Sequence, residues 1–161
     1  MAIPRKPLRI YVDTSVIGGC FDAEFKEFSL RVIERARTGE AILVISDTTV
    51  IELLGAPPSV GGVLEDLPAH SLEFLTQNDE TRTLAEEYLR QAVVPRRMVA
   101  DARHIAAATV AKVDVLVSWN FRHIVNLDRI RAFNAVNLRA GYAMLEIRSP
   151  LEVWKDDNEN V

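Results

Sequence analysis

Residues 8–15 read Leu-Arg-Ile-Tyr-Val-Asp-Thr-Ser (LRIYVDTS), and this stretch decides the fold class. Its first part is a short apolar run, which predicts a buried strand. It then passes directly into Asp13, Thr14 and Ser15, residue types that accept hydrogen bonds from the free N–H groups of a helix start. The same change from strand to helix recurs at residues 41–47 (AILVISD). Buried strands that lead into helices are typical of a parallel sheet wrapped by helices.

The rest of the chain continues this alternation. Apolar runs predict further strands at residues 41–45, 72–75, 114–118 and 144–147. Helical periodicity and cap residues predict helices at residues 24–38, 47–54, 81–92, 99–111 and 127–139, with short ones at 63–67 and 121–125. We therefore predict one doubly wound α/β domain over residues 1–154, with a parallel sheet of four or five strands flanked by helices. Residues 155–161 are polar, and we expect them to form a disordered tail.

The composition of the chain indicates the cellular compartment that we expect for the protein. The chain has 161 residues, of which 48% are hydrophobic, and no apolar run approaches the length that spans a bilayer. Its first residues, MAIPRKPLRIYV, include basic side chains but no apolar core of signal-peptide length. The single Cys20 has no partner for an intramolecular disulfide, which fits a reducing compartment. We expect a cytoplasmic protein with no membrane segment.

Charge is distributed unevenly along the chain. Residues 96–139 contain eight Arg or Lys and three Asp, so this segment has a charge of +5. Because the whole chain has a net charge of −4, the remaining residues together carry −9. A local basic face binds a phosphate backbone even when the whole molecule is acidic. Solvated helix faces explain the same pattern, and the sequence leaves both interpretations open.

Four polar residues lie at or near predicted strand ends and helix starts: Asp13, Glu52, Asp101 and Asn120. In open parallel sheets, ligands bind beyond the carboxyl ends of the strands, at the point where the strand order reverses. Three carboxylates gathered there repel one another unless a cation neutralises them. Mg²⁺ prefers oxygen ligands of this kind. The sequence therefore points to divalent metal and phosphate chemistry.

Each of these residues also has a structural interpretation. Asp13 and Asp101 both fit helix caps. Glu52 fits an exposed helix position, and Asn120 fits a turn after a strand. His104 follows Asp101 by three residues on one helical face, which suggests a metal ligand. We favour a packed, hydrogen-bonded histidine, because an oxygen-rich metal site does not require an imidazole.

Four segments in order resemble one family. They are residues 12–17 (VDTSVI), 48–54 (TTVIELL), 101–108 (DARHIAAA) and 113–124 (VDVLVSWNFRHI). Together they resemble the PIN-domain ribonucleases, above all the VapC-like toxins of type II toxin–antitoxin pairs. The resemblance covers roughly residues 10–124 and implies a PIN-like fold. It implies a Mg²⁺- or Mn²⁺-dependent endoribonuclease that hydrolyses RNA phosphodiester bonds.

The resemblance also implies roles for individual residues. It places the metal-binding carboxylates at Asp13, Glu52 and Asp101. It places hydroxyl groups that support the metal and its waters at Thr14 or Ser15.

Asn120 departs from the family, because many members have a further Asp at this position. Its amide adds no negative charge, but it can coordinate through oxygen or hydrogen-bond a metal-bound water. We therefore expect Asn120 to complete the catalytic set. We expect Arg103, Arg122 or His123 to contact the RNA backbone.

The family implies an RNA substrate, a small antitoxin whose tail occupies the acidic pocket, and a homodimer. Apolar residues of the first two helices are candidate surfaces or core: Val16, Ile17, Phe21, Phe25 and Phe28. A catalytically weak PIN-fold module that binds RNA or protein remains an alternative. A phosphotransfer receiver is disfavoured, because it expects paired acids after the first strand and this chain has Asp13 alone.

Overall fold

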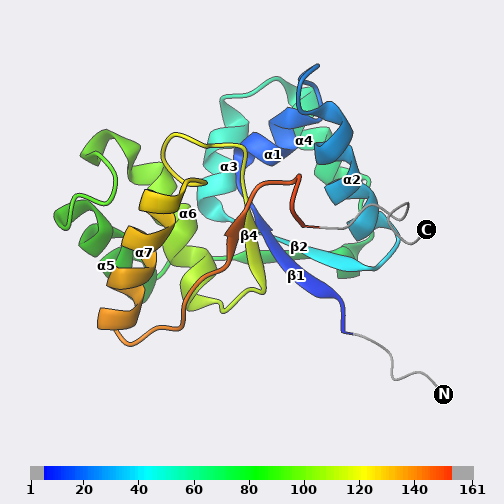
Figure 1. Ribbon diagram of the computed structural model, residues 1–161. Helices are drawn as coiled ribbons and strands as arrows, with labels where there is room; N and C mark the ends of the chain where they lie inside the picture. Colours follow the sequence, from blue (N-terminus) through cyan, green and yellow to red (C-terminus); the bar gives the residue numbers. More distant parts are fainter. Residues whose placement is uncertain (1–5, 154–161) are drawn as a thin grey trace, which may run out of the picture.

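The computed structural model describes residues 6–153 and is built around a parallel sheet (Figure 1). Five strands form it in the order β3-β2-β1-β4-β5, and every neighbouring pair is parallel. The strands are β1 (Leu8–Val12), β2 (Ala41–Ser46), β3 (Leu72–Leu75), β4 (Val115–Val117) and β5 (Ile147–Arg148). This confirms the predicted doubly wound α/β fold.

Helices cover both faces of the sheet. They are α1 (Thr14–Gly19), α2 (Lys26–Arg37), α3 (Asp47–Leu54), α4 (Pro58–Glu65), α5 (Asp79–Arg90), α6 (Val99–Val110) and α7 (Leu127–Arg139). Short 3-10 turns lie at Ala69–Ser71 and Arg96–Met98. Helices α1, α2 and α4 lie on one side of the sheet, and α5, α6 and α7 lie on the other (Figure 1). None of the helices in residues 6–153 combines the length and hydrophobicity that crossing a membrane requires.

Successive residues of the central strand enter different cores. Ile10 and Val12 pack into the core beneath α1, α2 and α4, whereas Tyr11 packs into the core beneath α5, α6 and α7. All three side chains are fully buried. Since side chains alternate across a strand, a strand covered on both faces is apolar throughout, as the sequence of β1 suggested.

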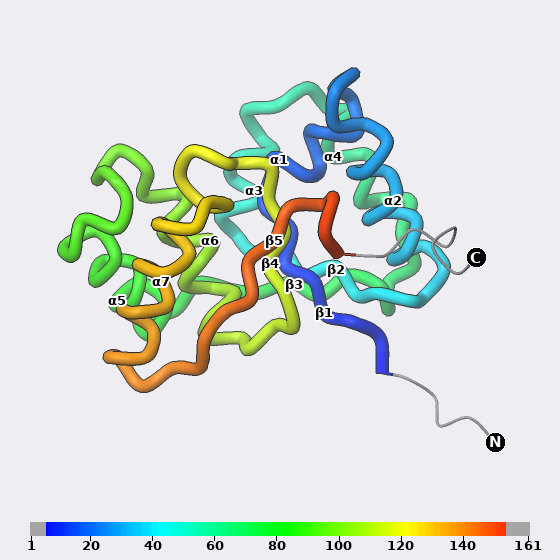
Figure 2. Tube along the Cα trace, viewed as in Figure 1, coloured from blue at the N-terminus to red at the C-terminus, as the bar shows by residue number. Residues whose placement is uncertain are grey.

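The chain path creates one reversal of strand order. From β1 the chain first builds β2 and β3 on one side, and it then crosses to form β4 and β5 on the other. Figure 2 shows β4 and β5 beside β1. Asp13 directly follows β1 and its main-chain N–H donates to Val117 O at 3.4 Å. Asp13 and Ser118 therefore stand together at the switch point, where doubly wound folds bind ligands.

Most predicted elements are confirmed, and three differ. The short helix predicted at residues 63–67 is α4, which begins earlier because Pro58 suits the first turn of a helix. The short helix predicted at 121–125 is wrong. There, one turn closes on the carbonyl of Asn120, which accepts from the N–H groups of both Ile124 and Val125, and residues 121–126 form turns and bends instead of a helix.

The last strand starts later than the predicted 144–147. Asn134 of α7 explains this, because its Oδ1 accepts from Leu145 N at 2.7 Å and its Nδ2 donates to Leu145 O at 3.1 Å. The main chain of Leu145 is thus bonded to a helix side chain instead of a neighbouring strand. The prediction of a disordered tail at 155–161 concerns residues outside the described range.

Candidate active site

Asp13 lies at the centre of the candidate site and is only 4% exposed. Its Oδ1 accepts from Ser15 Oγ at 2.5 Å, and its Oδ2 accepts from Ser118 Oγ at 2.6 Å. It stands at the N-cap position of α1, but its side chain makes no capping hydrogen bond. Burial raises the pKa of Asp13, although the charge of His104 and the two serine hydroxyls oppose the shift. Asp13 is therefore a buried carboxylate held by neutral groups, and the cap interpretation is wrong.

Two serines connect the end of β1 to the segment after β4. Ser15 Oγ accepts from Trp119 N at 2.9 Å, and Ser118 Oγ accepts from Asn120 N at 2.9 Å. Each serine hydroxyl thus accepts a hydrogen bond from a main-chain N–H and donates a hydrogen bond to Asp13. Ser118 is a site residue that the sequence analysis missed. The sequence feature that could have identified Ser118 is a hydroxyl residue at the end of a buried apolar strand.

Glu52 reaches the site from α3, with 37% of its side chain exposed. Its Oε1 accepts from Thr14 Oγ1 at 2.9 Å and contacts His104 Nε2. Burial acts to raise the pKa of Glu52, but the hydrogen bond and charge of His104, together with Thr14, lower the pKa overall. Glu52 is therefore ionised and fixed through one of its two oxygens.

Asp101 approaches from the first turn of α6. Its Oδ2 accepts from Asn120 Nδ2 at 3.2 Å. Burial raises the pKa of Asp101 to about 6, and the negative charges of Asp13 and Glu52 contribute to the increase. The three carboxylates are thus close enough to influence one another, although they come from three separate segments of the chain.

Asn120 organises the loop that follows β4. It donates to Asp101, and its Oδ1 accepts from His123 N at 3.0 Å. Its turn interpretation is therefore confirmed, and its contact with Asp101 also brings it into the acidic cluster. His104 is confirmed as a packed, hydrogen-bonded residue, because it is 2% exposed and both ring nitrogens have partners.

The predicted RNA-contacting residues differ in exposure. Arg103 and Arg122 are exposed, whereas His123 is only 8% exposed and its Nδ1 has no hydrogen-bond partner among the described residues. Burial lowers the pKa of His123, and the charges of nearby Arg122, Arg129 and Arg97 add to this effect. His123 is therefore an inward-facing neutral residue surrounded by guanidinium groups.

A ready-made metal cage is absent from the described part of the chain: no group of three or more His, Cys, Asp or Glu in residues 6–153 is placed to hold an ion. The donor chemistry still suits Mg²⁺, which proteins commonly bind through one or two carboxylates together with several waters. Asp13 and Asp101 supply such carboxylates, and both lack a Lys or Arg ion-pair partner among the described residues.

No protein-family model matches the chain, and no curated protein matches it in sequence. Solved structures do match its fold. VapBC2 from Rickettsia felis, bound to a promoter DNA fragment, has a TM-score of 0.57 at 14% identity and covers 88% of this chain and 98% of its own. VapC20 of Mycobacterium tuberculosis, described as a sarcin-ricin loop cleaving toxin, has a TM-score of 0.55 at 14% identity, covering 85% and 98%. FitAcB from Neisseria gonorrhoeae has a TM-score of 0.55 at 15% identity, covering 89% and 99%. The chain therefore has the PIN-like α/β fold of these structures.

Proposed function

We propose that the protein is a Mg²⁺- or Mn²⁺-dependent endoribonuclease that hydrolyses RNA phosphodiester bonds and serves as the toxin of a toxin–antitoxin pair. One observation carries this proposal. Asp13, Glu52 and Asp101 come from β1–α1, α3 and α6 and gather at the switch point of the sheet. VapC20, which shares the fold, is described as a sarcin-ricin loop cleaving toxin.

The cluster calls for a cation because its charges are not balanced from within. The negative charges of Asp13 and Glu52 raise the pKa of Asp101, and that of Glu52 also raises the pKa of Asp13. No Lys or Arg among the described residues pairs with any of the three carboxylates. A divalent ion held there would supply activation of water and neutralisation of charge on a phosphodiester. We assign the holding of this ion to Asp13 and Asp101, with Glu52 as a further ligand or as the acceptor for a bound water.

The remaining site residues fix the positions of these carboxylates. Ser15 and Ser118 hold the two oxygens of Asp13, and Thr14 holds one oxygen of Glu52. Asn120 holds Asp101. Groups that are fixed before substrate binds need no reorganisation during the reaction, which is the main source of electrostatic catalysis.

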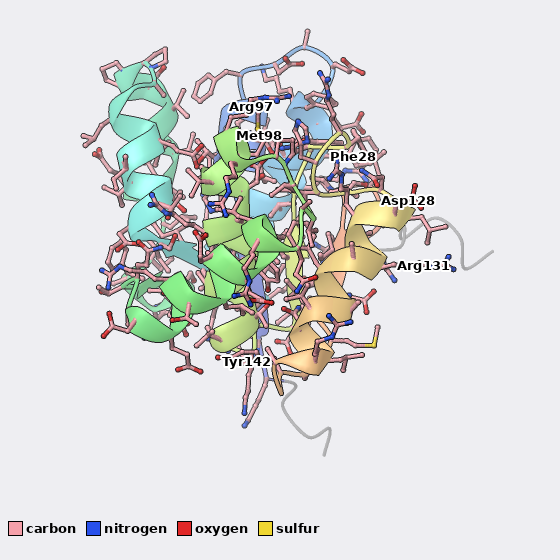
Figure 3. The ribbon with its side chains drawn as sticks, turned by 90° about the vertical axis from the view of Figure 1, so that its left-hand side faces the viewer. Phe28, Arg97, Met98, Asp128, Arg131 and Tyr142 are labelled. Carbon is pink, nitrogen blue, oxygen red and sulfur yellow. The ribbon has the colours of Figure 1, made fainter. Side chains whose placement is uncertain are left out.

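The arginines of the described residues fall into two groups. Those paired with a carboxylate are Arg9, Arg31, Arg35, Arg37, Arg82, Arg90, Arg96 and Arg148. Those for which residues 6–153 provide no carboxylate partner are Arg97, Arg103, Arg122, Arg129, Arg131 and Arg139. The second group falls within the basic segment of the sequence. Figure 3 shows Arg97 beside the start of α6 and Arg131 on α7.

Of this second group, Arg129 donates to Val93 O, whereas the exposed guanidinium groups of Arg103 and Arg122 make no hydrogen bond within residues 6–153 and are available to phosphate oxygens. Arg103 follows Asp101 by two residues, and Arg122 follows Asn120 by two residues. We therefore propose that Arg103 and Arg122, both exposed, bind the RNA backbone. Direct contact of His123 with RNA stays a prediction.

An antitoxin and a second copy of the chain are the proposed protein partners. The candidate surface is smaller than the sequence suggested, because Val16 and Ile17 are fully buried in the core. Phe21 is 55% exposed, and Ile51 and Leu54 of α3 are 65% and 82% exposed. We assign antitoxin contact to these three side chains. A cytoplasmic location stays a prediction.

A second candidate function is an RNA- or protein-binding module that does not cleave. The absence of a three-residue metal cage among residues 6–153 favours it. This module would bind RNA equally well in Mg²⁺ and in EDTA.

The test uses purified protein with single-stranded and hairpin RNA in Mg²⁺, Mn²⁺ or EDTA. We expect cleavage by the wild type in either metal and none in EDTA. We expect no cleavage by Asp13→Asn/Asp101→Asn, which keeps the size of both side chains and leaves each an amide oxygen that can accept one hydrogen bond. Cleavage that persists in EDTA or in the double variant contradicts the proposal. Binding without products at enzyme excess supports the second candidate.

A further inference from the structure

A buried chain of hydrogen bonds leads from the centre of the sheet to Glu52. Tyr11 of β1 is fully buried, and its hydroxyl lies 2.7 Å from Ser46 Oγ and 2.6 Å from His104 Nδ1. The other ring nitrogen of His104 contacts Glu52 Oε1. The chain thus connects β1, the end of β2, α6 and α3.

The direction of each bond follows from the chemistry of the groups. An ionised carboxylate only accepts, so His104 Nε2 must carry a proton and donate to Glu52. In a neutral ring Nδ1 then accepts, and Tyr11 donates to it. A phenol is un-ionised at neutral pH, so Tyr11 has this proton to donate. Ser46 completes the chain by donating to the Tyr11 oxygen.

We propose that Tyr11 and His104 are positioning residues that hold the imidazole in its Nε2–H tautomer and thereby fix Glu52 for catalysis. The catalytic part of this inference rests on the proposed nuclease function. Glu52 Oε1 is occupied by His104 and Thr14, whereas Oε2 has no hydrogen-bond partner among the described residues. The chain of bonds therefore leaves one defined oxygen available to a metal ion or its water.

Two other roles for His104 fit the contacts less well. A metal ligand needs a free ring nitrogen, and both nitrogens of His104 have protein partners. A histidine that only fills the core needs no contact with a carboxylate that is 37% exposed. Holding a flexible Glu side chain accounts for both contacts at once.

Tyr88 provides a matched control for Tyr11. Both phenols are fully buried in the same core, and the Tyr88 hydroxyl likewise bonds to side chains, those of Asn137 and Thr109. None of these bonds leads to the acidic cluster. The Tyr88→Phe change thus removes a buried hydroxyl without disturbing Glu52.

The experiment compares Tyr11→Phe, His104→Gln and His104→Ala with Tyr88→Phe. NMR of the imidazole nitrogens reads the tautomer of His104, and carbon relaxation reads the order of the Glu52 side chain. Calorimetry gives Mn²⁺ affinity, and RNA cleavage gives kcat and KM separately. Thermal melts of all variants identify any that fail to fold.

We expect the Nε2–H tautomer in the wild type, with loss of Glu52 order in Tyr11→Phe but not in Tyr88→Phe. Mn²⁺ affinity or kcat should fall about 10–100-fold in Tyr11→Phe and His104→Ala, with KM nearly unchanged. His104→Gln should recover part of the loss, because its amide can donate to Glu52.

An Nδ1–H tautomer overturns the proposal, as does a Tyr11→Phe variant that matches Tyr88→Phe in Glu52 order. The two NMR readouts need neither metal nor RNA. If the wild type neither binds Mn²⁺ nor cleaves, the nuclease function fails, and the NMR result separately decides whether Tyr11 and His104 position Glu52.

Discussion

The charged side chains at the amino ends of the strands and those at the carboxyl ends have different partners. Near the amino ends of the strands, Arg9 pairs with Glu73, and its main-chain N–H donates to Asp114 at 2.7 Å. At the carboxyl ends, Asp13 and Asp101 are held by serine hydroxyls and an amide. At the amino end the guanidinium of Arg9 thus neutralises Glu73 within the protein, whereas at the carboxyl end no Lys or Arg among the described residues pairs with Asp13 or Asp101, and their charge is left for a ligand to balance. This difference distinguishes a functional carboxylate from a structural one.

The strongest test of this comparison replaces one carboxylate at each end. Asp13→Asn should lower kcat for RNA cleavage by about 10²–10³-fold, because it removes a carboxylate to which we assign the holding of the divalent ion. Asp114→Asn should leave cleavage nearly unchanged, since an amide oxygen can still accept from Arg9 N. Steady-state kinetics of both variants measure the difference. Equal losses would show that the two ends do not differ in function.

Packing beneath the carboxyl end allows a test on adjacent glycines. A Cβ at Gly19 would lie 2.4 Å from Ser29 Oγ and 2.9 Å from Trp119 Nε1, whereas a Cβ at Gly18 meets nothing within 4 Å. Gly19→Ala should lower the free energy of unfolding by about 1–3 kcal/mol through overpacking. Gly18→Ala should be neutral or slightly stabilising, because it lies within helix α1. Urea unfolding checks both, and equal stabilities would contradict the packing described around Trp119.

The two groups of arginines extend the comparison to RNA binding. Arg122→Ala should weaken RNA binding by about 3–10-fold and reduce its salt dependence, because one phosphate contact is lost. Arg96→Ala is the control, since Arg96 already pairs with Glu86 at 3.0 Å. Fluorescence anisotropy over a series of salt concentrations measures both effects. A larger effect of Arg96→Ala would mean that ion pairing does not mark the RNA-binding arginines.

The smallest expected effect is the pH dependence of stability. The folded protein raises the pKa of Asp101 from its ordinary 3.8 to about 6, so the folded state binds the proton more tightly than the unfolded state does. Stability therefore falls as pH rises through this window, and it stays reduced above it.

Asp101→Asn removes this cost. Without divalent ions at about pH 7.5, the variant should melt about 2–4 °C higher than the wild type. This shift corresponds to a gain of ~1 kcal/mol in the free energy of unfolding, after allowance for solvent screening of the partly exposed carboxylate. At about pH 4 the difference should be much smaller, because Asp101 is then protonated in the folded state and partly protonated in the unfolded state. Scanning calorimetry at the two pH values decides, and a gain that persists unchanged at low pH would contradict the raised pKa.

Much of the fold was predictable because its signals are local. Residues 8–12, 72–75 and 127–139 form elements with the predicted bounds, since apolar runs and helical periodicity depend on near neighbours. The start of β5 was not predictable, because it depends on Asn134, a residue of another element that bonds to Leu145.

The site divides in the same way. Asp13, Glu52 and Asp101 were predicted from their residue types and their places along the chain, and the structure brings them together. Tyr11 and Ser118 were missed, because each looks like an ordinary member of a buried strand. Their importance lies in hydrogen bonds to residues about 90–105 positions away, which no local pattern contains.

The most direct test of the central claim is calorimetric titration of the wild type and of Asp13→Asn/Asp101→Asn with Mn²⁺. The account predicts saturable binding to the wild type and none to the double variant, with both proteins folded. Such a result would show that carboxylates from distant segments form one cation site. Equal binding by both proteins, or no binding by the wild type, would contradict the claim that the carboxyl end of the sheet holds a divalent ion.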